Sequence, residues 1–208
     1  MADDTITRAA AVGHGIHLEY WTVAWNLVEG LISVIAGLMA GSVALLAFGI
    51  DSSIETSSGA VLLWRLRAEQ RGGHAETLER TAIRLVGISF VLLAAYVTWD
   101  ALTSLLNHEP PRRSLVGIIL AILSLIAMPL LARAKRRAAT TLSSAALHAD
   151  SRQTSICAYL SFILLAGLLL NATLGWWWAD PIAALIMVPL ITKEAIDGLR
   201  GKACTDCH

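Results

Sequence analysis

The sequence predicts an all-α integral membrane protein with six transmembrane helices and both termini in the cytoplasm. Composition supports this, because 56% of the residues are hydrophobic and 15% are charged, whereas soluble domains average about 25% charged residues. Apolar runs of membrane-crossing length recur along the chain. Such runs are expected to be helical, because lipid offers no hydrogen-bond partners to backbone N–H and C=O groups. Positive residues gather in alternate connections, which sets the orientation.

The expected spans follow one another with short polar connections. A membrane-crossing helix needs about 20 mostly apolar residues. Such segments lie at residues 20–40, 43–65, 82–106, 114–132, 146–171 and 179–197. The connections after the second and fourth spans carry Arg65, Arg67, Arg71, Arg80, Arg133, Lys135, Arg136 and Arg137. The connections after the first and fifth spans have no Lys or Arg, and the one after the third has Arg112 and Arg113 only. The chain ends are therefore expected on the cytoplasmic side.

The expected domain organisation has three parts. Residues 1–18 form a cytoplasmic N-terminal segment, residues 19–198 a six-helix transmembrane domain, and residues 199–208 a short cytoplasmic Cys/His tail. The formal net charge of zero gives no electrostatic basis for binding nucleic acid, and the start lacks the features of a secretory signal peptide. We expect a multi-pass protein in the lipid bilayer of a bacterial inner (plasma) membrane.

Two acidic residues stand at the centre of the second expected span. Asp51 and Glu55 are four residues apart, so they share one helix face. Like charges this close destabilise each other, and ionisable residues within spans mark functional sites by default. A bound cation would relieve the repulsion, and carboxylate oxygens suit divalent metals. The alternative is that one acid is protonated and the other pairs with Arg152.

The fifth expected span carries a second pair at the same spacing, Gln153 and Cys157. Both pairs fall near the middle of their spans. Together they offer two carboxylates, an amide oxygen and a thiolate, a mixed set that Zn²⁺ accepts; the thiolate argues against Mg²⁺ and Ca²⁺. Taken singly, Cys157 has the alternative role of a small buried apolar side chain, and Gln153 that of an interhelical hydrogen bond.

These stretches resemble the cation diffusion facilitator family, whose members are proton-coupled exporters of Zn²⁺ and related divalent metals. The resemblance is seen first in GSVALLAFGIDSSIETSSG, where the family's two metal-binding positions fall on Asp51 and Glu55. It continues in SSAALHADSRQT, which leads to the family's next two positions at Gln153 and Cys157. The first and sixth spans resemble the family in WNLVEGLISVIAGLMAGS and WWADPIAALIMVPLITKEAIDGLRG. The resemblance implies a cation diffusion facilitator-like transmembrane bundle that forms a homodimer.

The sequence departs from the family pattern in three ways. The usual His and Asp of the fifth span are Gln153 and Cys157, and the second acid of the second span is Glu55 rather than Asp. The residues after the sixth span do not resemble the family's cytoplasmic C-terminal domain, so we expect a small branch that consists of the membrane domain only.

The resemblance implies transport by alternating access. A divalent cation, most simply Zn²⁺ but alternatively Fe²⁺, Co²⁺, Cd²⁺ or Mn²⁺, would bind between the second and fifth spans and leave outward as protons compete for the acids. The metal is then the substrate, and no prosthetic group is expected. The alternative is a non-transporting metal sensor or membrane scaffold that keeps the fold. We expect no enzyme, since the sequence lacks a G-x-S-x-G elbow or an H-E-x-x-H motif.

Three further features complete the candidate list. Glu29 in the first span is either a proton-binding or secondary cation group, or a carboxylic acid hydrogen-bonded between helices. Asp150 is expected to be structural or to pair with Arg152. Cys204, Cys207 and His208 in the tail form a possible clamp for a soft metal, the alternative being a disordered chain end.

Overall fold

Six α-helices form the computed structural model, which describes residues 2–70, 76–108, 110–142 and 144–200. They are α1 (Ala2–Ala40), α2 (Val43–Gln70), α3 (Glu76–Asn107), α4 (Leu115–Leu142), α5 (Ala145–Leu174) and α6 (Ala179–Leu199). No strand occurs among the described residues. The predicted all-α fold with six helices is confirmed.

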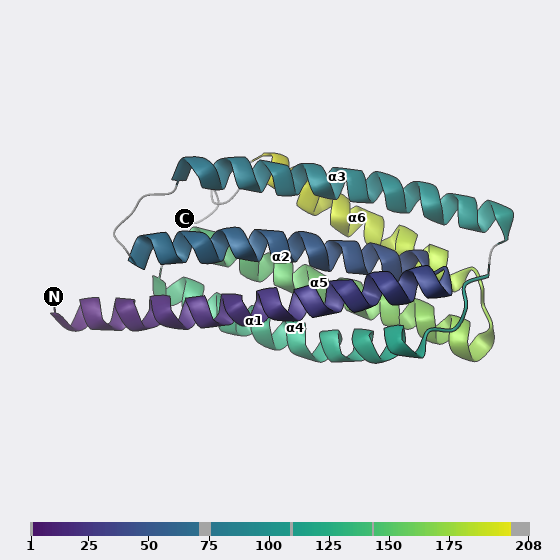
Figure 1. Ribbon diagram of the computed structural model, residues 1–208, viewed down its shortest axis with the longest axis horizontal. Coiled ribbons are helices and arrows are strands. Elements are labelled where there is room, and N and C mark those ends of the chain that lie inside the picture. The colour runs from purple at the N-terminus through teal and green to yellow at the C-terminus, as the bar shows by residue number, and fades with distance from the viewer. Residues whose placement is uncertain (1, 71–75, 109, 143, 201–208) are drawn as a thin grey trace.

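The helices lie roughly along one axis, and successive helices run in opposite directions (Figure 1). As a result, α1 begins and α6 ends toward the same end of the bundle, which we call the inner end. The opposite end, the outer end, holds the turn between α1 and α2. An arrangement of this kind is the one expected of a chain whose two ends face the same side of a membrane.

The bundle is built from helix pairs. The closest associations are α1 with α2, α4 with α5 and α3 with α6, and α3 and α6 lie along one side of the other four (Figure 1). Glycines bring α1 and α2 together, because a Cβ at Gly49 would lie 2.8 Å from the backbone nitrogen of Val34, and one at Gly37 would lie 2.9 Å from that of Leu46. Small residues of this kind permit close helix packing in membranes.

Four of the six helices are long and apolar enough to cross a bilayer, over Val12–Ala40, Arg84–Asn107, Leu115–Leu142 and Asp150–Leu174. The polar centre of α2 lowers the hydropathy of that helix, and α6 carries charges in its last turns. Large apolar side chains such as Trp21, Leu38 and Leu106 are more than two-thirds exposed on the outside of the bundle. Lipid is the solvent that suits such a surface, and the protein is a multi-pass membrane protein.

Helix α4 extends ten residues past its expected end at residue 132, to Leu142. Lys135 therefore lies within the helix and is fully buried. The prediction that it belongs to a cytoplasmic connection is wrong. The physical reason is helical spacing, since Met128, Ala132, Lys135 and Ala139 follow one another at intervals of three or four residues and all face the interior.

A buried carboxylate joins the outer ends of three helices. Asp180, in the first turn of α6, accepts a hydrogen bond of 2.5 Å from the hydroxyl of Ser42 and one of 3.4 Å from the backbone nitrogen of Ala44. Ser42 lies in the turn between α1 and α2. The Asp–Pro pair that begins α6 thus anchors that turn and holds the start of α2 in register with α6.

Candidate metal centre

The acidic pair of α2 faces the interior of the bundle. Asp51 is 6% exposed and Glu55 is 1% exposed. They continue the stripe of buried side chains that begins with Ala44, Ala47 and Phe48 nearer the outer end of the helix. The same spacing that packs apolar side chains into the core therefore carries both carboxylates into it.

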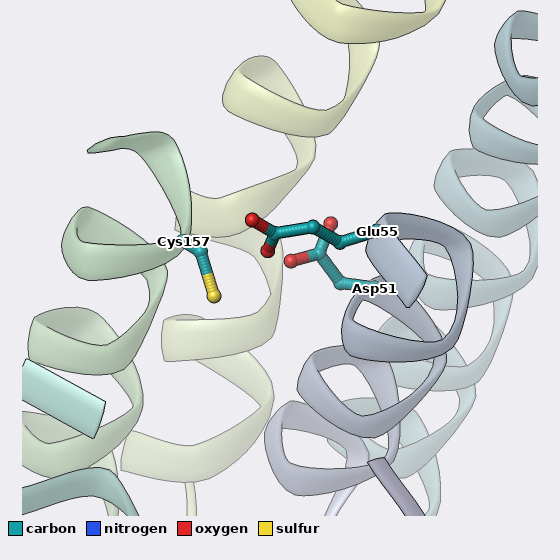
Figure 2. A group of neighbouring side chains, drawn as sticks. All are labelled: Asp51, Glu55 and Cys157. Atoms are coloured by element: carbon teal, nitrogen blue, oxygen red, sulfur yellow. The ribbon is translucent and has the colours of Figure 1, made fainter. Parts of the chain in front are cut away.

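Cys157 of α5 lies opposite this pair (Figure 2). Its side chain is 1% exposed. One carboxylate oxygen of Asp51, one of Glu55 and the sulfur of Cys157 all lie within 4.8 Å of one another. We call these three residues the acid–thiol group. In the part of the chain that the structure describes, it is the one group of three or more His, Cys, Asp or Glu side chains close enough to share a metal ion.

The two oxygens of Glu55 have different surroundings. Oε1 accepts a hydrogen bond of 2.9 Å from the hydroxyl of Thr154 on α5. Oε2 is buried and has no hydrogen-bond partner. One oxygen is therefore held by the protein, and the other is available to a ligand.

No Lys, Arg or His side chain among the described residues forms an ion pair with Asp51 or Glu55. The alternative in which Arg152 neutralises one of these acids is wrong, because Arg152 is exposed and forms no such pair. The acid–thiol group thus holds two buried carboxylates without an ion-paired cation of its own.

Gln153 lies one turn before Cys157 on α5. It is half-buried, and its Nε2 atom is buried without a hydrogen-bond partner. The interhelical hydrogen bond considered as its alternative role is therefore not made by this nitrogen. A role for Gln153 as fourth metal ligand stays a prediction.

Glu29 on α1 lies beside the acidic face of α2. Its Oε1 accepts a hydrogen bond of 3.2 Å from the indole nitrogen of Trp25, and its Oε2 accepts one of 3.2 Å from the hydroxyl of Ser52. Ser52 is the neighbour of Asp51 in the chain. The geometry matches an acid hydrogen-bonded between helices, and the proton-binding role stays a prediction.

Asp150 forms an ion pair with Lys135 of α4 rather than with Arg152. The same ammonium group lies 3.2 Å from Oε1 of Glu19 on α1. Asp150 is therefore structural in its contacts, and the expected partner was wrong because α4 extends further than its apolar run. Sequence reasoning missed Lys135 and Glu19 as interior residues.

A sequence signal exists for the burial of Glu19, though not for that of Lys135. Glu19, Thr22, Asn26, Glu29 and Ser33 follow the heptad spacing of a packed helix face, and each is at most 1% exposed. Polar residues at every position of such a helix face predict that this face of α1 packs against polar side chains of neighbouring helices. The possible tail clamp of Cys204, Cys207 and His208 lies outside the described residues.

The family model and the similar proteins found by comparison all point to one family. The model of the cation efflux transmembrane domain matches residues 21–201. The chain is 26% identical over 187 residues to the cation-efflux pump FieF of Shewanella oneidensis, which covers 85% of this chain and 61% of that protein. It is 26% identical over 195 residues to a cadmium, cobalt and zinc/H(+)-K(+) antiporter of Bacillus subtilis, covering 86% and 60% of the two chains.

The chain thus spans less than two-thirds of the length of these relatives. The family match covers the second half of α1 and all of α2 to α6, including α2 and α5 with the acid–thiol group. The resemblance noted in the first, second, fifth and sixth spans is confirmed. The chain belongs to the cation diffusion facilitator, or cation efflux, family.

Proposed function

We propose that this chain exports a divalent metal cation, most simply Zn²⁺, from the cytoplasm through a site between α2 and α5. The observation that carries the proposal is the acid–thiol group, with its three ligand atoms within 4.8 Å of one another. Buried acids are costly inside a membrane. A divalent cation between Asp51 and Glu55 offsets that cost, because it balances the charge of both carboxylates.

The donor set supports zinc or a similar borderline metal. Ligand atoms of tetrahedral Zn²⁺ lie about 3.5 Å apart, so small side-chain movements would close the group around an ion. The amide oxygen of Gln153 is the proposed fourth ligand. Because the sulfur of Cys157 is a soft ligand, Cd²⁺ is the first alternative, followed by Co²⁺, Fe²⁺ and Mn²⁺. The Bacillus subtilis relative is named for cadmium, cobalt and zinc.

Protons are the proposed counter-ion. A carboxylate or thiolate must be deprotonated to bind a metal, so metal binding and proton binding compete. Exchange of one divalent cation for two protons leaves the net charge of Asp51 and Glu55 together with their ligand unchanged, and binding by Cys157 as a thiolate releases a third proton. Glu29 is a further candidate proton group. The Bacillus subtilis relative is named an H(+)-K(+) antiporter, so K⁺ is the alternative counter-ion.

The transport cycle follows from these exchanges. With the site open to the inner end, the metal displaces protons from the acids. A rigid-body tilt of helices then opens the site to the outer end, where protons displace the metal. We propose that two copies of the chain form a homodimer, as the family resemblance implies.

The test is metal flux into proteoliposomes that contain a fluorescent chelator. We expect Zn²⁺ uptake that needs a pH gradient and disappears in Asp51→Ala. The matched control is Asp197→Asn, which removes a half-exposed acid in the last turns of α6 and is expected to leave flux unchanged. Absence of flux for Zn²⁺, Cd²⁺, Co²⁺, Fe²⁺ and Mn²⁺ in a folded preparation would contradict the transporter.

A second function has one observation in its favour. Gln153 and Cys157 stand where the family resemblance leads one to expect a His and an Asp. A non-transporting sensor or scaffold would bind metal at the acid–thiol group without moving it. Metal binding by the purified protein together with no flux would identify this alternative.

A further inference from the structure

Lys135 is a fully buried cation that the transport cycle above does not use. Its ammonium nitrogen lies 3.2 Å from Oε1 of Glu19, forms an ion pair with Asp150 and lies 3.3 Å from the hydroxyl oxygen of Thr154. These contacts join α4 to α1 and α5. A buried charge is tolerated only when partners of this kind surround it, so the cluster is a fixed element of the inner half of the bundle.

Thr154 connects this cluster to the acid–thiol group. Its hydroxyl group accepts a hydrogen bond from Lys135 at the oxygen and donates its O–H, at 2.9 Å, to Oε1 of Glu55. The backbone carbonyl of Asp150 lies within reach of the same proton, at 3.1 Å. The carboxylate is the shorter contact, and charged acceptors make the stronger bonds. An ammonium group only donates, so Lys135 directs the lone pair of Thr154 toward itself and leaves the hydroxyl proton for Glu55.

The contact has a consequence for Glu55. Its Oε1 is held by Thr154, while its Oε2 is buried with no hydrogen-bond partner. A carboxylate oxygen of Glu55 also lies within 4.8 Å of a carboxylate oxygen of Asp51 and of the sulfur of Cys157. We propose that Lys135 and Thr154 are positioning residues, which hold Glu55 so that one oxygen is free to bind the transported metal. This inference rests on the proposed function of the acid–thiol group.

The charge of Lys135 does not oppose this role. A lone ammonium group near the site would repel a divalent cation, but Glu19 and Asp150 face the same nitrogen and offset its field. The influence on Glu55 is therefore carried mainly by the short hydrogen bond through Thr154. Outer partners that orient metal ligands in this way change metal affinity by about 10–100-fold when they are removed.

The first experiment measures Zn²⁺ affinity of the purified full chain in lipid nanodiscs by titration calorimetry. Thr154→Val removes the hydroxyl, keeps the side-chain shape and leaves the ion pairs of Lys135 in place. We expect its affinity to fall by about 10–100-fold, and Thr154→Ser, which restores the hydroxyl, to recover affinity. The matched control is Thr173→Val on the same helix, where an exposed hydroxyl bonds only the carbonyl of Leu169.

Flux gives a readout that a packing defect would not reproduce. If Thr154 positions a metal ligand, the KM for Zn²⁺ rises in Thr154→Val while the maximal rate changes little. Wild-type affinity and KM in Thr154→Val would overturn the inference and leave the proposed function intact. Failure of the wild-type chain to bind metal would instead overturn the proposed function, and this inference with it.

A second experiment asks whether Lys135 acts through Thr154. Lys135→Met alone would leave Glu19 and Asp150 buried without a cation. It is therefore combined with Glu19→Gln and Asp150→Asn, so that none of the three positions carries a charge. If the action passes through Thr154, adding Thr154→Val to this triple variant costs little further affinity. If the affinity losses of the triple variant and of Thr154→Val simply add, Lys135 does not act on Glu55 through Thr154. If the triple variant does not fold, the pair Asp150→Asn and Glu19→Gln with Lys135 kept is compared with and without Thr154→Val, and an affinity loss equal to that of Thr154→Val in the wild type would contradict a role for the charge cluster.

Discussion

Two groups of buried acids lie about 10 Å apart along α5, at Asp150 and at Cys157. The inner group contains Glu19 and Asp150 and has its own cation, Lys135. The acid–thiol group contains Asp51 and Glu55 and, among the described residues, has no ion-paired cation. The difference separates a structural charge cluster from a site for a mobile ion. Where the protein supplies the positive charge the acids are fixed, and where it does not, a substrate cation can supply it.

The largest expected effect is the loss of transport when the acid–thiol group loses a carboxylate. Asp51→Asn keeps the volume of the side chain but removes half of the negative charge that balances the metal. We expect metal flux to fall by about 100-fold or more, because a direct ligand matters at least as much as its outer partners. Proteoliposome flux is the measurement. Flux near the wild-type level would show that the acid–thiol group is not the site of the transported ion.

The next effect is on stability and has opposite outcomes in the two groups. Lys135→Met strands Glu19 and Asp150, which should lower the free energy of unfolding by about 3–5 kcal/mol. Asp51→Asn removes a buried charge that has no internal partner, so it should leave stability unchanged or raise it. Unfolding in mixed detergent micelles without added metal gives both values. Equal destabilisation by the two variants would show that the acid–thiol group is also structural.

A smaller effect concerns which metal the acid–thiol group prefers. Cys157→Ser replaces a soft sulfur by a hard oxygen, so the affinity for Cd²⁺ should fall by more than the affinity for Mn²⁺. Competition titrations of the purified protein with the two metals provide the ratio. An unchanged ratio would show that Cys157 is a buried apolar side chain rather than a ligand.

The smallest expected effect belongs to Gln153. Its amide oxygen is neutral and its side chain is only half-buried, so Gln153→Ala should weaken Zn²⁺ binding by about tenfold, at the low end of the range for supporting groups. Gln153→Glu serves as the matched variant, since it keeps the shape and adds a charge. If both variants bind like the wild type, the site has three protein ligands and Gln153 is not among them.

Hydropathy predicted the six helices. The four-residue spacing of each pair, its position near the middle of its span and the family resemblance together predicted that Asp51 and Glu55 face Gln153 and Cys157. That Asp51, Glu55 and Cys157 bind a metal stays a prediction. The inner group was not predicted. Lys135 lies beyond the apolar run of its span, among other positive residues, and this pattern is typical of a cytoplasmic connection. Its burial depends on α4 continuing to Leu142 and on Glu19 and Asp150 from two other helices, and no local pattern reports such partners.

The most direct test of the mobile-ion site is X-ray absorption of the zinc-loaded protein with Cys204 and Cys207 replaced by Ser, so that Cys157 is the only sulfur ligand available from a thiol. We expect oxygen ligands at about 2.0–2.2 Å and one sulfur at about 2.3 Å. The sulfur should vanish in Cys157→Ser, and zinc binding should vanish in Asp51→Ala. A zinc ion that stays bound in Asp51→Ala, or that shows no sulfur ligand, would contradict the acid–thiol group as the metal site.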